Sequence, residues 1–240
     1  MKIELIIMAY TKRYTVPKSW PIRVKENKYV VSPLAGPHSK ETCIPLGLIL
    51  RDMLKHAHTM KEAMQILNQG TVKINGITRK HRGFPVGLMD VVDVGGDFYR
   101  MLPTSHGLRL LKTSVTDAGL RLARIKNKGH VKKKKLQLNF HDGSNMLVDK
   151  DTFKTSDVVV IDIATKKIKD VIKFEKGAFA IVIDGHNAGA NGKIENIDRK
   201  LKTVTLDSDG RKFPVPIRYI FVVGQGGPAV KLGEERKEVA

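Results

Sequence analysis

The chain contains little of the chemistry that builds disulfides or metal sites. Cys43 is the only cysteine in 240 residues, so neither an internal disulfide nor a cysteine-based zinc site can form. The eight histidines are scattered, and only His56 and His58 lie close together, at a spacing that does not place both rings on one face of a helix. We therefore expect no bound metal and a reducing compartment.

Signals for export and for membrane binding are also scarce. Residues 1–14, MKIELIIMAYTKRY, carry an apolar run that is too short for a secretory signal and that no small-residue cleavage site follows. A strongly amphipathic basic helix or a lipidation motif would favour a membrane surface, and we find neither. We predict no membrane partner, and we interpret residues 1–7 as an alternative-start extension or a short added strand.

The glycine-rich stretch VIDGHNAGANGKIENI, residues 182–197, lacks the pattern of a nucleotide-binding loop. Asn187 stands where a P-loop needs its first glycine, and Ile194 stands where it needs a hydroxyl. Aspartates such as Asp142 and Asp157 have no partner at catalytic spacing and suit local hydrogen bonds to the backbone. We therefore predict no catalytic residue, no cofactor and no small-molecule substrate, and hence that the protein is not an enzyme.

Negative charge is scarce as well, because 24 Asp and Glu stand against 43 Lys and Arg. The formal net charge is +19 and the pI is near 10.0, so a compact chain repels itself unless a polyanion neutralises it. Hydrophobic residues make up 41% of the chain, enough for two or three small domains to bury cores. Nucleic acid is favoured as the partner over an anionic membrane or simple solvation.

The first 42 residues mix prolines, cations and aromatic residues, and they cannot build a core alone. We predict that residues 1–42 form a basic N-terminal arm that becomes ordered against a partner, where cations meet phosphates and aromatic rings stack on bases. The alternative is that Trp20 and Tyr29 attach this arm to the chain's own core.

Residues 43–105 show the signals of a small helical and hairpin domain. Apolar residues recur at helical spacing from Leu46 to Ala57, and a second helix begins after Thr59, with Glu62 positioned for a capping box. Its expected buried stripe is Met60, Ala63, Met64 and Leu67. The pair Asn75-Gly76 predicts a type I′ hairpin, and a strand, a Gly-Gly turn and another strand follow and close the domain near Pro103.

The remaining chain reads as strands. The runs LRLLK, LARIK, LQLNF, NMLVD, DVVVIDI and DVIKF predict a β-rich central domain over residues 106–175 with a basic edge. Four short runs within residues 176–228 (179–183, 193–197, 203–206 and 212–215) are typical of a small barrel. A charged tail occupies residues 229–240.

Several stretches, in this order and spacing, resemble the S-four-e family of small-subunit ribosomal proteins of archaea and eukaryotes: KRYTVPKSW, SPLAGPHSKETCIPL, FPVGLMDVV, VIKFEKG and IFVVGQGG. The resemblance implies an α+β, multidomain fold with an S-four-type RNA-binding domain, a family-specific central domain and a KOW-type, SH3-like barrel. Within the barrel, GKI at 192–194 matches the KOW motif. The longer basic C-terminal extension of eukaryotic members is missing, which favours an archaeal source.

The function that this resemblance implies is structural. We expect a constituent of the small ribosomal subunit in the cytoplasm, with small-subunit rRNA and neighbouring ribosomal proteins as partners. The alternatives are a KOW-type transcription elongation factor, whose partner would be polymerase, and an accessory factor in RNA modification. The elongation factor would leave the helical domain and most of the charge unexplained, and the remaining domains are too small for a modifying enzyme's catalytic domain.

The candidate RNA-binding residues are cations and amides in the arm, beside the hairpin of the first domain, at the central domain's edge and in the glycine-rich loop. In that loop, Gly185, Gly189 and Gly192 would allow positive φ angles and a close approach to a partner backbone, although they could serve the barrel's turns alone. The candidates are Lys12, Arg13, Lys18, Arg23, His38, Arg51, Lys55, Lys73, Arg79, Lys80, Arg82, Lys132, Lys133, Lys134, Asn187, Asn191, Lys193, Arg199 and Lys200.

Overall fold

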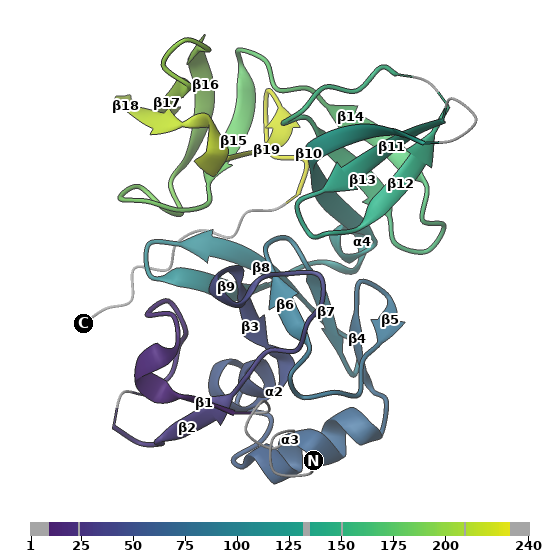
Figure 1. Ribbon diagram of the computed structural model, residues 1–240, viewed down its shortest axis with the longest axis vertical. Helices are drawn as coiled ribbons and strands as arrows, with labels where there is room; N and C mark the ends of the chain where they lie inside the picture. Colours follow the sequence, from purple (N-terminus) through teal and green to yellow (C-terminus); the bar gives the residue numbers. More distant parts are fainter. Residues whose placement is uncertain (1–9, 24, 132–134, 150, 209, 231–240) are drawn as a thin grey trace.

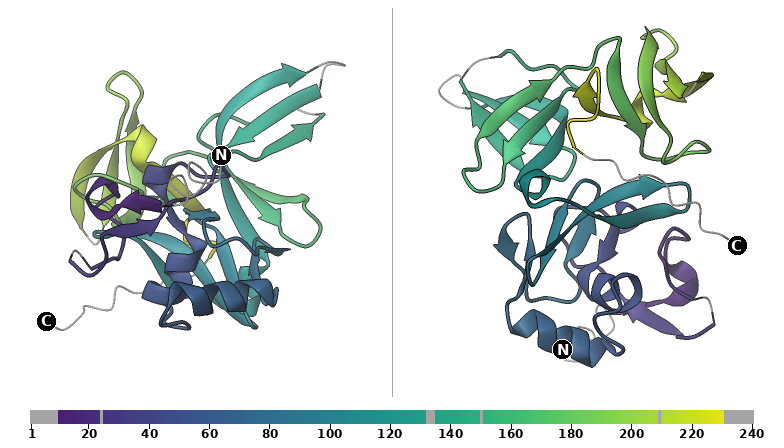
Figure 2. Two further views of the ribbon diagram at one scale, coloured as in Figure 1. Left: turned by 60° about the horizontal axis from the view of Figure 1, so that its bottom comes forward. Right: turned by 180° about the vertical axis from the view of Figure 1, so that it is seen from behind.

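The computed structural model describes residues 10–23, 25–131, 135–149, 151–208 and 210–230. It is multidomain, as predicted, and it is richer in strands than the α+β prediction indicated, because its few helices are short. In Figure 1 the first domain lies at the bottom, and the central and C-terminal domains lie side by side above it; Figure 2 gives two further views of this arrangement. Within the described ranges, no helix is long and apolar enough to cross a bilayer.

The N-terminal arm is ordered by packing on the first domain of its own chain. Its strands β1 (Tyr10–Lys12) and β2 (Tyr29–Val31) pair antiparallel, and a 3-10 turn, η1 (Arg13–Thr15), follows β1. Between the strands, Trp20 is buried in the first domain's core together with arm residues Val16, Ile22 and Val30. The prediction that the arm needs a partner to become ordered was therefore wrong for its described part, because these four apolar side chains pack in the chain's own core. Tyr29 does not join that core.

The first helix of the first domain is shorter than the spacing of its apolar residues predicts. After the 3-10 turn η2 (Lys40–Thr42) and strand β3 (Cys43–Pro45), α2 (Leu46–Leu48) runs directly into a π-helical turn, η3 (Ile49–Met53). The predicted helix to Ala57 was too long, because Lys55 takes a positive φ of 56° and reverses the chain. Leu46, Leu48, Ile49 and Leu50 are nevertheless completely buried.

The second predicted helix forms with the expected cap. It is α3 (Met60–Asn68), and the Thr59 hydroxyl accepts a hydrogen bond from the Glu62 N–H at 3.2 Å. Glu62 reaches back to the N–H of His58, one residue earlier than in a standard capping box, at 2.8 Å. Ala63 and Leu67 are buried, but Met64 is 38% exposed, so its assignment to the buried stripe was wrong.

A five-stranded sheet completes this domain in the order β5-β4-β7-β8-β9, and β3 pairs separately with β6. The predicted turn at Asn75 and Gly76 is confirmed, since both have the positive φ angles of a type I′ turn. Strand β9 pairs with β8, so the expected domain boundary between residues 105 and 106 falls inside a hairpin of one sheet. The strands are β4 (Val72–Ile74), β5 (Ile77–Thr78), β6 (Pro85–Gly87), β7 (Val91–Val94), β8 (Asp97–Thr104) and β9 (Gly107–Lys112).

The central domain is a second antiparallel sheet, in the order β12-β11-β10-β13-β14, preceded by the short helix α4 (Val115–Ala118). Five of the six predicted runs fall on its strands; the sixth, LRLLK, is β9 of the first sheet. Alternate residues such as Leu136, Leu138 and Phe140 are buried in a small core of its own. The strands are β10 (Leu120–Val131), β11 (Lys135–Phe140), β12 (Asn145–Val148), β13 (Val158–Asp162) and β14 (Ile168–Ile172).

The C-terminal domain is a third five-stranded sheet, in the order β18-β17-β16-β15-β19. All four predicted runs fall on strands, and β19 adds a fifth that pairs with β15 after the 3-10 turn η5 (Ile217–Tyr219). The strands are β15 (Ala178–Val182), β16 (Asn191–Asp198), β17 (Thr203–Ser208), β18 (Arg211–Pro216) and β19 (Ile220–Gln225).

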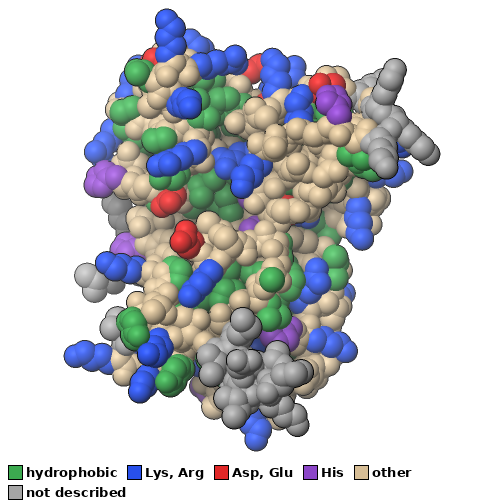
Figure 3. All heavy atoms as spheres, in the orientation of Figure 1, with side chains coloured by type: hydrophobic (Ala, Val, Ile, Leu, Met, Phe, Trp, Pro, Cys, Tyr) green, Lys and Arg blue, Asp and Glu red, His purple; other side chains and the backbone are tan. Residues whose placement is uncertain are grey.

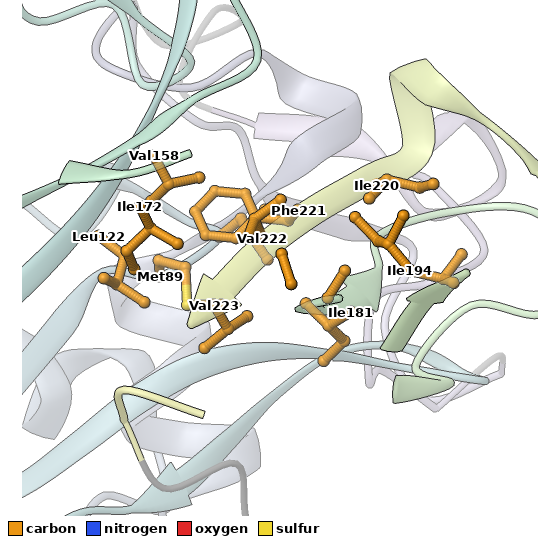
Figure 4. Packing of buried hydrophobic residues seen from close by; sticks show 14 of the residues in the cluster. Met89, Leu122, Val158, Ile172, Ile181, Ile194, Ile220, Phe221, Val222 and Val223 are labelled. Atoms are coloured by element: carbon orange, nitrogen blue, oxygen red, sulfur yellow. The ribbon is translucent and has the colours of Figure 1, made fainter. Parts of the chain in front are cut away.

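One hydrophobic core joins the three domains. Strand β19 lies at its centre, where Phe221, Val222 and Val223 are fully buried. Figure 4 shows Met89 of the first domain and Leu122 of the central domain in the same cluster. Because tightly packed apolar interiors resist sliding, the surfaces of the three domains keep a fixed relation to one another.

Candidate nucleic-acid interface

The candidate residues that remain exposed lie on the N-terminal arm, the first domain and the C-terminal domain. Lys73 lies on β4 between two buried residues, so strand alternation directs its side chain outward. On the face shown in Figure 3, Lys and Arg side chains extend from the top of the molecule to the bottom, and Asp and Glu are sparse. The exposed candidates are Lys12, Lys18, Arg23, Lys55, Lys73, Lys80, Asn191, Lys193, Arg199 and Lys200.

Four candidate arginines are partly buried and bind groups of their own chain. Arg13 donates a hydrogen bond to the Ile22 carbonyl at 2.8 Å. Arg51 forms a two-pronged ion pair with its neighbour Asp52, with distances of 2.8 and 3.0 Å between the paired atoms. This fork supports the local turn and occupies much of the donor capacity that a phosphate would need.

The other two lie on aromatic rings. The guanidinium of Arg79 stacks 4.4 Å from the centre of the Phe84 ring, and that of Arg82 lies 4.8 Å from the centre of the Tyr10 ring. The second contact joins the N-terminal arm to the basic cluster that follows the hairpin. The structure therefore brings the two candidate regions together, a proximity that no local sequence pattern indicates.

His38 is the clearest correction among the candidates. Its ring is buried, and its Nε2 lies 2.9 Å from the Asp90 carboxylate. Burial alone raises the pKa of Asp90, but the hydrogen bonds from His38, Gly87 and Asn75 outweigh it and hold that pKa below its ordinary value. His38 thus anchors the arm to the first domain and presents no polar atom to RNA.

The glycine-rich loop makes its close contacts within this chain. Gly189 has a φ of 85°, and a Cβ at this position would lie 2.8 Å from the Thr104 Cα in the β8–β9 turn of the first domain. At Gly192 a Cβ would overlap the Asp207 carbonyl of the neighbouring strand. Gly189 and Gly192 therefore allow packing inside the protein, which corrects the approach to a partner backbone expected at these two positions; at Gly185, which is exposed with a φ of 99°, that approach stays a prediction. Asn187 is half-buried, whereas Asn191 and Lys193 are exposed.

The basic edge of the central domain is described only in part. Lys132, Lys133 and Lys134 lie outside the described residues, as do residues 1–9 and 231–240. Next to this gap, Lys128 donates to Asp151 at 2.6 Å and to the Phe153 carbonyl at 2.7 Å. That lysine supports the fold of the central domain.

Sequence reasoning missed Arg100, which is fully buried. Its Nη2 donates to the carbonyls of Asp117 and Leu120, both at 2.7 Å, and so ties β8 to helix α4 and the start of β10. Burial lowers the pKa of Arg100 to about 10, so the guanidinium keeps its charge at neutral pH. A single cation inside the apolar run FYRMLP was the signal that could have revealed it.

Arg124 and His141 form a second junction that the sequence did not reveal. Arg124 donates to the carbonyls of Arg218 and Ile220, at 3.0 and 2.8 Å. The His141 ring accepts from the Arg124 N–H at 3.2 Å and donates to the Leu88 carbonyl at 3.3 Å, with its edge toward Phe221. Burial lowers the pKa of His141 to about 4, so the ring is neutral. These contacts join the three domains.

The remaining polar groups within the described ranges do not assemble into a reactive site. Among the described residues, no group of three or more His, Cys, Asp or Glu side chains gathers as metal ligands would. Burial raises the pKa of the Cys43 thiol to about 12, which makes it a poor nucleophile. Asp142 pairs with Arg121, and Asp157 accepts hydrogen bonds from the N–H groups of Lys154 and Phe174. Both aspartates have structural roles.

These features define a class: a rigid, β-rich, multidomain protein whose outer surface carries the positive charge. Three family models match the chain. They are the ribosomal family S4e over residues 95–168, the RS4NT (NUC023) domain over residues 10–41 and the KOW motif over residues 176–207.

Relatives cover almost the whole chain. The small ribosomal subunit protein eS4 of Pyrobaculum islandicum is 40% identical over 236 residues, which cover 94% of this chain and 99% of the relative. The eS4 protein of Methanothermobacter thermautotrophicus is 40% identical over 231 residues, which cover 93% and 95%. The crystal structure of the 30S ribosomal protein S4e from Thermoplasma acidophilum matches with a TM-score of 0.70 and 29% identity, over 78% of this chain and 97% of that one. The chain belongs to the S4e family of ribosomal proteins.

Proposed function

We propose that this protein is a structural, non-enzymatic constituent of the small ribosomal subunit that binds small-subunit rRNA and stabilises its fold. The observation that carries this proposal is the arrangement of charge. Exposed cations lie on all three domains, and one shared core holds those domains in a fixed relation. A rigid body with cations on several faces can bridge RNA segments that would otherwise repel each other.

Two exposed groups of residues form the proposed rRNA-binding surfaces. The first lies on and after the hairpin of the first domain and includes Lys73 and Lys80. The second lies on β16 and the turn after it and includes Asn191, Lys193, Arg199 and Lys200. Such residues suit contacts with phosphate and ribose, which position a protein on RNA without reading its sequence.

The domain roles follow the same reasoning. We assign the role of an S-four-type RNA-binding domain to the helical and hairpin part, with β9 included. The sheet at residues 176–225 takes the role of an SH3-like KOW domain, supported by the KOW match. The N-terminal arm belongs to the first domain, on whose core it packs. The proposed partners are small-subunit rRNA and neighbouring ribosomal proteins, in the cytoplasm.

A transcription elongation factor or an accessory factor in RNA modification is not favoured. A KOW motif alone would fit the first alternative, but the match to eS4 proteins extends over the arm and all three domains. The proposed function accounts for the whole length of the chain.

Salt dependence of RNA binding tests the proposal. The full chain should bind small-subunit rRNA with an affinity that falls steeply with salt, with a logarithmic slope of about 0.7 to 0.9 for each phosphate contacted. It should also sediment with small subunits in moderate salt. An affinity that hardly responds to salt, or co-purification with polymerase instead of subunits, would overturn it.

A further inference from the structure

Three exposed tyrosines and their cations form one continuous strip on the N-terminal arm, which lies beside the first domain (Figure 1). We call this strip the tyrosine strip. It consists of Tyr10, Lys12, Tyr14, Lys28, Tyr29 and Arg82. The sequence places its members in three separate segments, and the β1–β2 hairpin with its contact to Arg82 brings them together.

The pairing of β1 with β2 places part of the strip on one face of the hairpin. In β2, Tyr29 is 54% exposed, whereas Val30 and Val31 are both buried. Lys12 is the cross-strand partner of Tyr29, so both side chains project from the same face of the hairpin. Tyr10 lies two residues before Lys12 and shares that face. Tyr10 is paired with the buried Val31 and is 38% exposed, so this face is more open at the end that carries Lys12 and Tyr29.

Each ring in the strip has a cation beside it. The ammonium of Lys12 lies 5.7 Å from the centre of the Tyr14 ring, and that of Lys28 lies 5.8 Å from the centre of the Tyr29 ring. The Arg13 N–H donates to the Lys28 carbonyl at 3.0 Å, which holds the two pairs next to each other. An alternation of aromatic rings and cations at this spacing is the composition of a surface that binds single-stranded nucleic acid.

The rings are exposed to an unusual extent for aromatic side chains. Tyr14 is 77% exposed and Tyr29 is 54% exposed, although the same arm buries Trp20 almost completely. Burial of these two rings in the core would be favourable, yet the arm leaves their apolar surface exposed to water. Unpaired RNA bases have apolar faces that can cover such rings, and the linked phosphates can approach the adjacent lysines.

We infer that the tyrosine strip is a binding site for unpaired RNA, in which bases stack on Tyr14 and Tyr29 while Lys12 and Lys28 contact the phosphates between them. The inference rests on the proposed function and adds a class of ligand to it. That ligand is a single-stranded loop or bulge of RNA and not an RNA double helix. Paired bases are already stacked within a duplex, so a duplex would meet only the lysines.

The experiment compares two RNA probes with the full chain. One is a labelled single-stranded 12-mer of uridines and adenosines without self-complementarity, and the other is a duplex of the same length. Tyr14→Ala with Tyr29→Ala should weaken single-strand binding by at least about 10-fold, since each stacked base contributes strongly to affinity. Duplex binding should change less than about two-fold, and its salt slope should stay the same, because no charge is removed.

Two further variants separate stacking from a general loss of surface. Tyr14→Phe with Tyr29→Phe keeps both rings and should restore single-strand affinity to near the wild-type value. Val115→Ala is the matched control, because this apolar side chain is 71% exposed in helix α4, away from the proposed rRNA-binding surfaces, and should leave both affinities unchanged. Thermal melting of all variants checks that the fold is intact.

The outcomes distinguish this inference from the proposed function. Unchanged single-strand affinity in the double alanine variant, or no rescue by phenylalanine, would overturn the tyrosine strip and leave rRNA binding standing. An equal loss for both probes would reduce the strip to a phosphate contact and would also contradict the inference. A wild-type chain that binds neither probe nor rRNA would overturn the proposed function itself.

Discussion

The junction between the domains and the outer surface use the same cationic side chains in opposite ways. At the junction, Arg100 and Arg124 are held by backbone carbonyls across domain boundaries. On the surface, Lys80 and Lys193 are exposed. The comparison teaches that a positive charge in a basic protein identifies an RNA contact only when its surroundings leave it accessible.

The difference follows from the cost of burying a charge. A guanidinium can leave water only if several acceptors replace its hydration, and carbonyls at the ends of elements supply them. Arg100 and Arg124 meet this requirement where two domains present such carbonyls, so each also fixes the position of one domain on another. A lysine in a surface turn stays hydrated and needs no carbonyl acceptors, so its ammonium can contact a phosphate.

The largest expected effect comes from removing a buried cation. Arg100→Met should lower the free energy of unfolding by about 3 kcal/mol, because the carbonyls of Asp117 and Leu120 lose a charged donor and stay buried. Chemical denaturation measures this loss. Arg109→Met, an exposed arginine on the neighbouring strand, is the control and should cost less than about 0.5 kcal/mol. Equal losses in the two variants would remove the distinction between junction and surface.

The next effect is a dependence of stability on pH at the junction. The pKa of His141 is about 4 in the folded protein and about 6.5 in the unfolded chain, so the unfolded chain binds more protons between these values. Stability should therefore be complete above pH 6.5 and decrease as the pH falls toward 4, by about 3 kcal/mol in total from this ring. Urea denaturation at several pH values measures the slope.

The variant His141→Gln sharpens this test. Glutamine can still donate to the Leu88 carbonyl but does not titrate, so the slope between pH 4 and 6.5 should shrink by about one proton. An unchanged slope in this variant would show that other groups cause the pH dependence. A wild-type protein of constant stability over this range would contradict the neutral, buried state of the ring.

A smaller effect is expected where the glycine-rich loop meets the first domain. Gly189→Ala should destabilise the protein by about 2 kcal/mol, from a positive φ and from the clash with the backbone of Thr104 and Ser105. Gly226→Ala is the matched control, because its φ is also positive but a Cβ there would meet nothing within 4 Å. The difference between the two melting temperatures isolates the contact between domains. If it is zero, the loop does not pack on the first domain.

The last prediction compares charge reversal at the neighbouring residues Lys80 and Arg79. Reversal at Lys80 should have the smallest effect on stability of all and a clear effect on RNA binding. Lys80→Glu should leave the melting temperature unchanged and weaken rRNA binding, with the salt slope reduced by about 0.7 to 0.9. The same reversal at Arg79 should lower the melting temperature, since it removes the stacking on Phe84 and places a carboxylate in a half-buried site. Equal behaviour of the two variants would contradict the assignment of Arg79 to the fold and Lys80 to the surface.

Much of the fold could be predicted from local patterns. Turn residues and alternation identified the hairpin at Asn75 and Gly76 and most of the strands, because both signals act between near neighbours in the chain. The end of the first helix could not be predicted, since the reversal at Lys55 depends on how the helix packs. The burial of Trp20 could not be predicted either, because the core around it is formed by residues much later in the sequence.

The candidate site shows the same limit. Composition and order of motifs were enough to indicate an RNA-binding protein of the S4e family. The candidate lysines that the structure describes are exposed. His38 was chosen wrongly, because its partner Asp90 is 52 residues away. Arg100, Arg124 and His141 were not among the candidate RNA-binding residues, and their structural roles could not be foreseen, since their partners belong to other elements that only the fold brings close.

By itself, the sequence determined the net charge of +19, the strand and turn pattern and the family of the protein, all of which are properties of residues in order. The tertiary structure alone decided which cations are buried and which meet solvent, and it assembled the tyrosine strip from three segments. The physical reason is that accessibility is set by contacts between residues distant in the chain. A side chain's chemistry is local, but the free energy of leaving it in water depends on everything that packs around it.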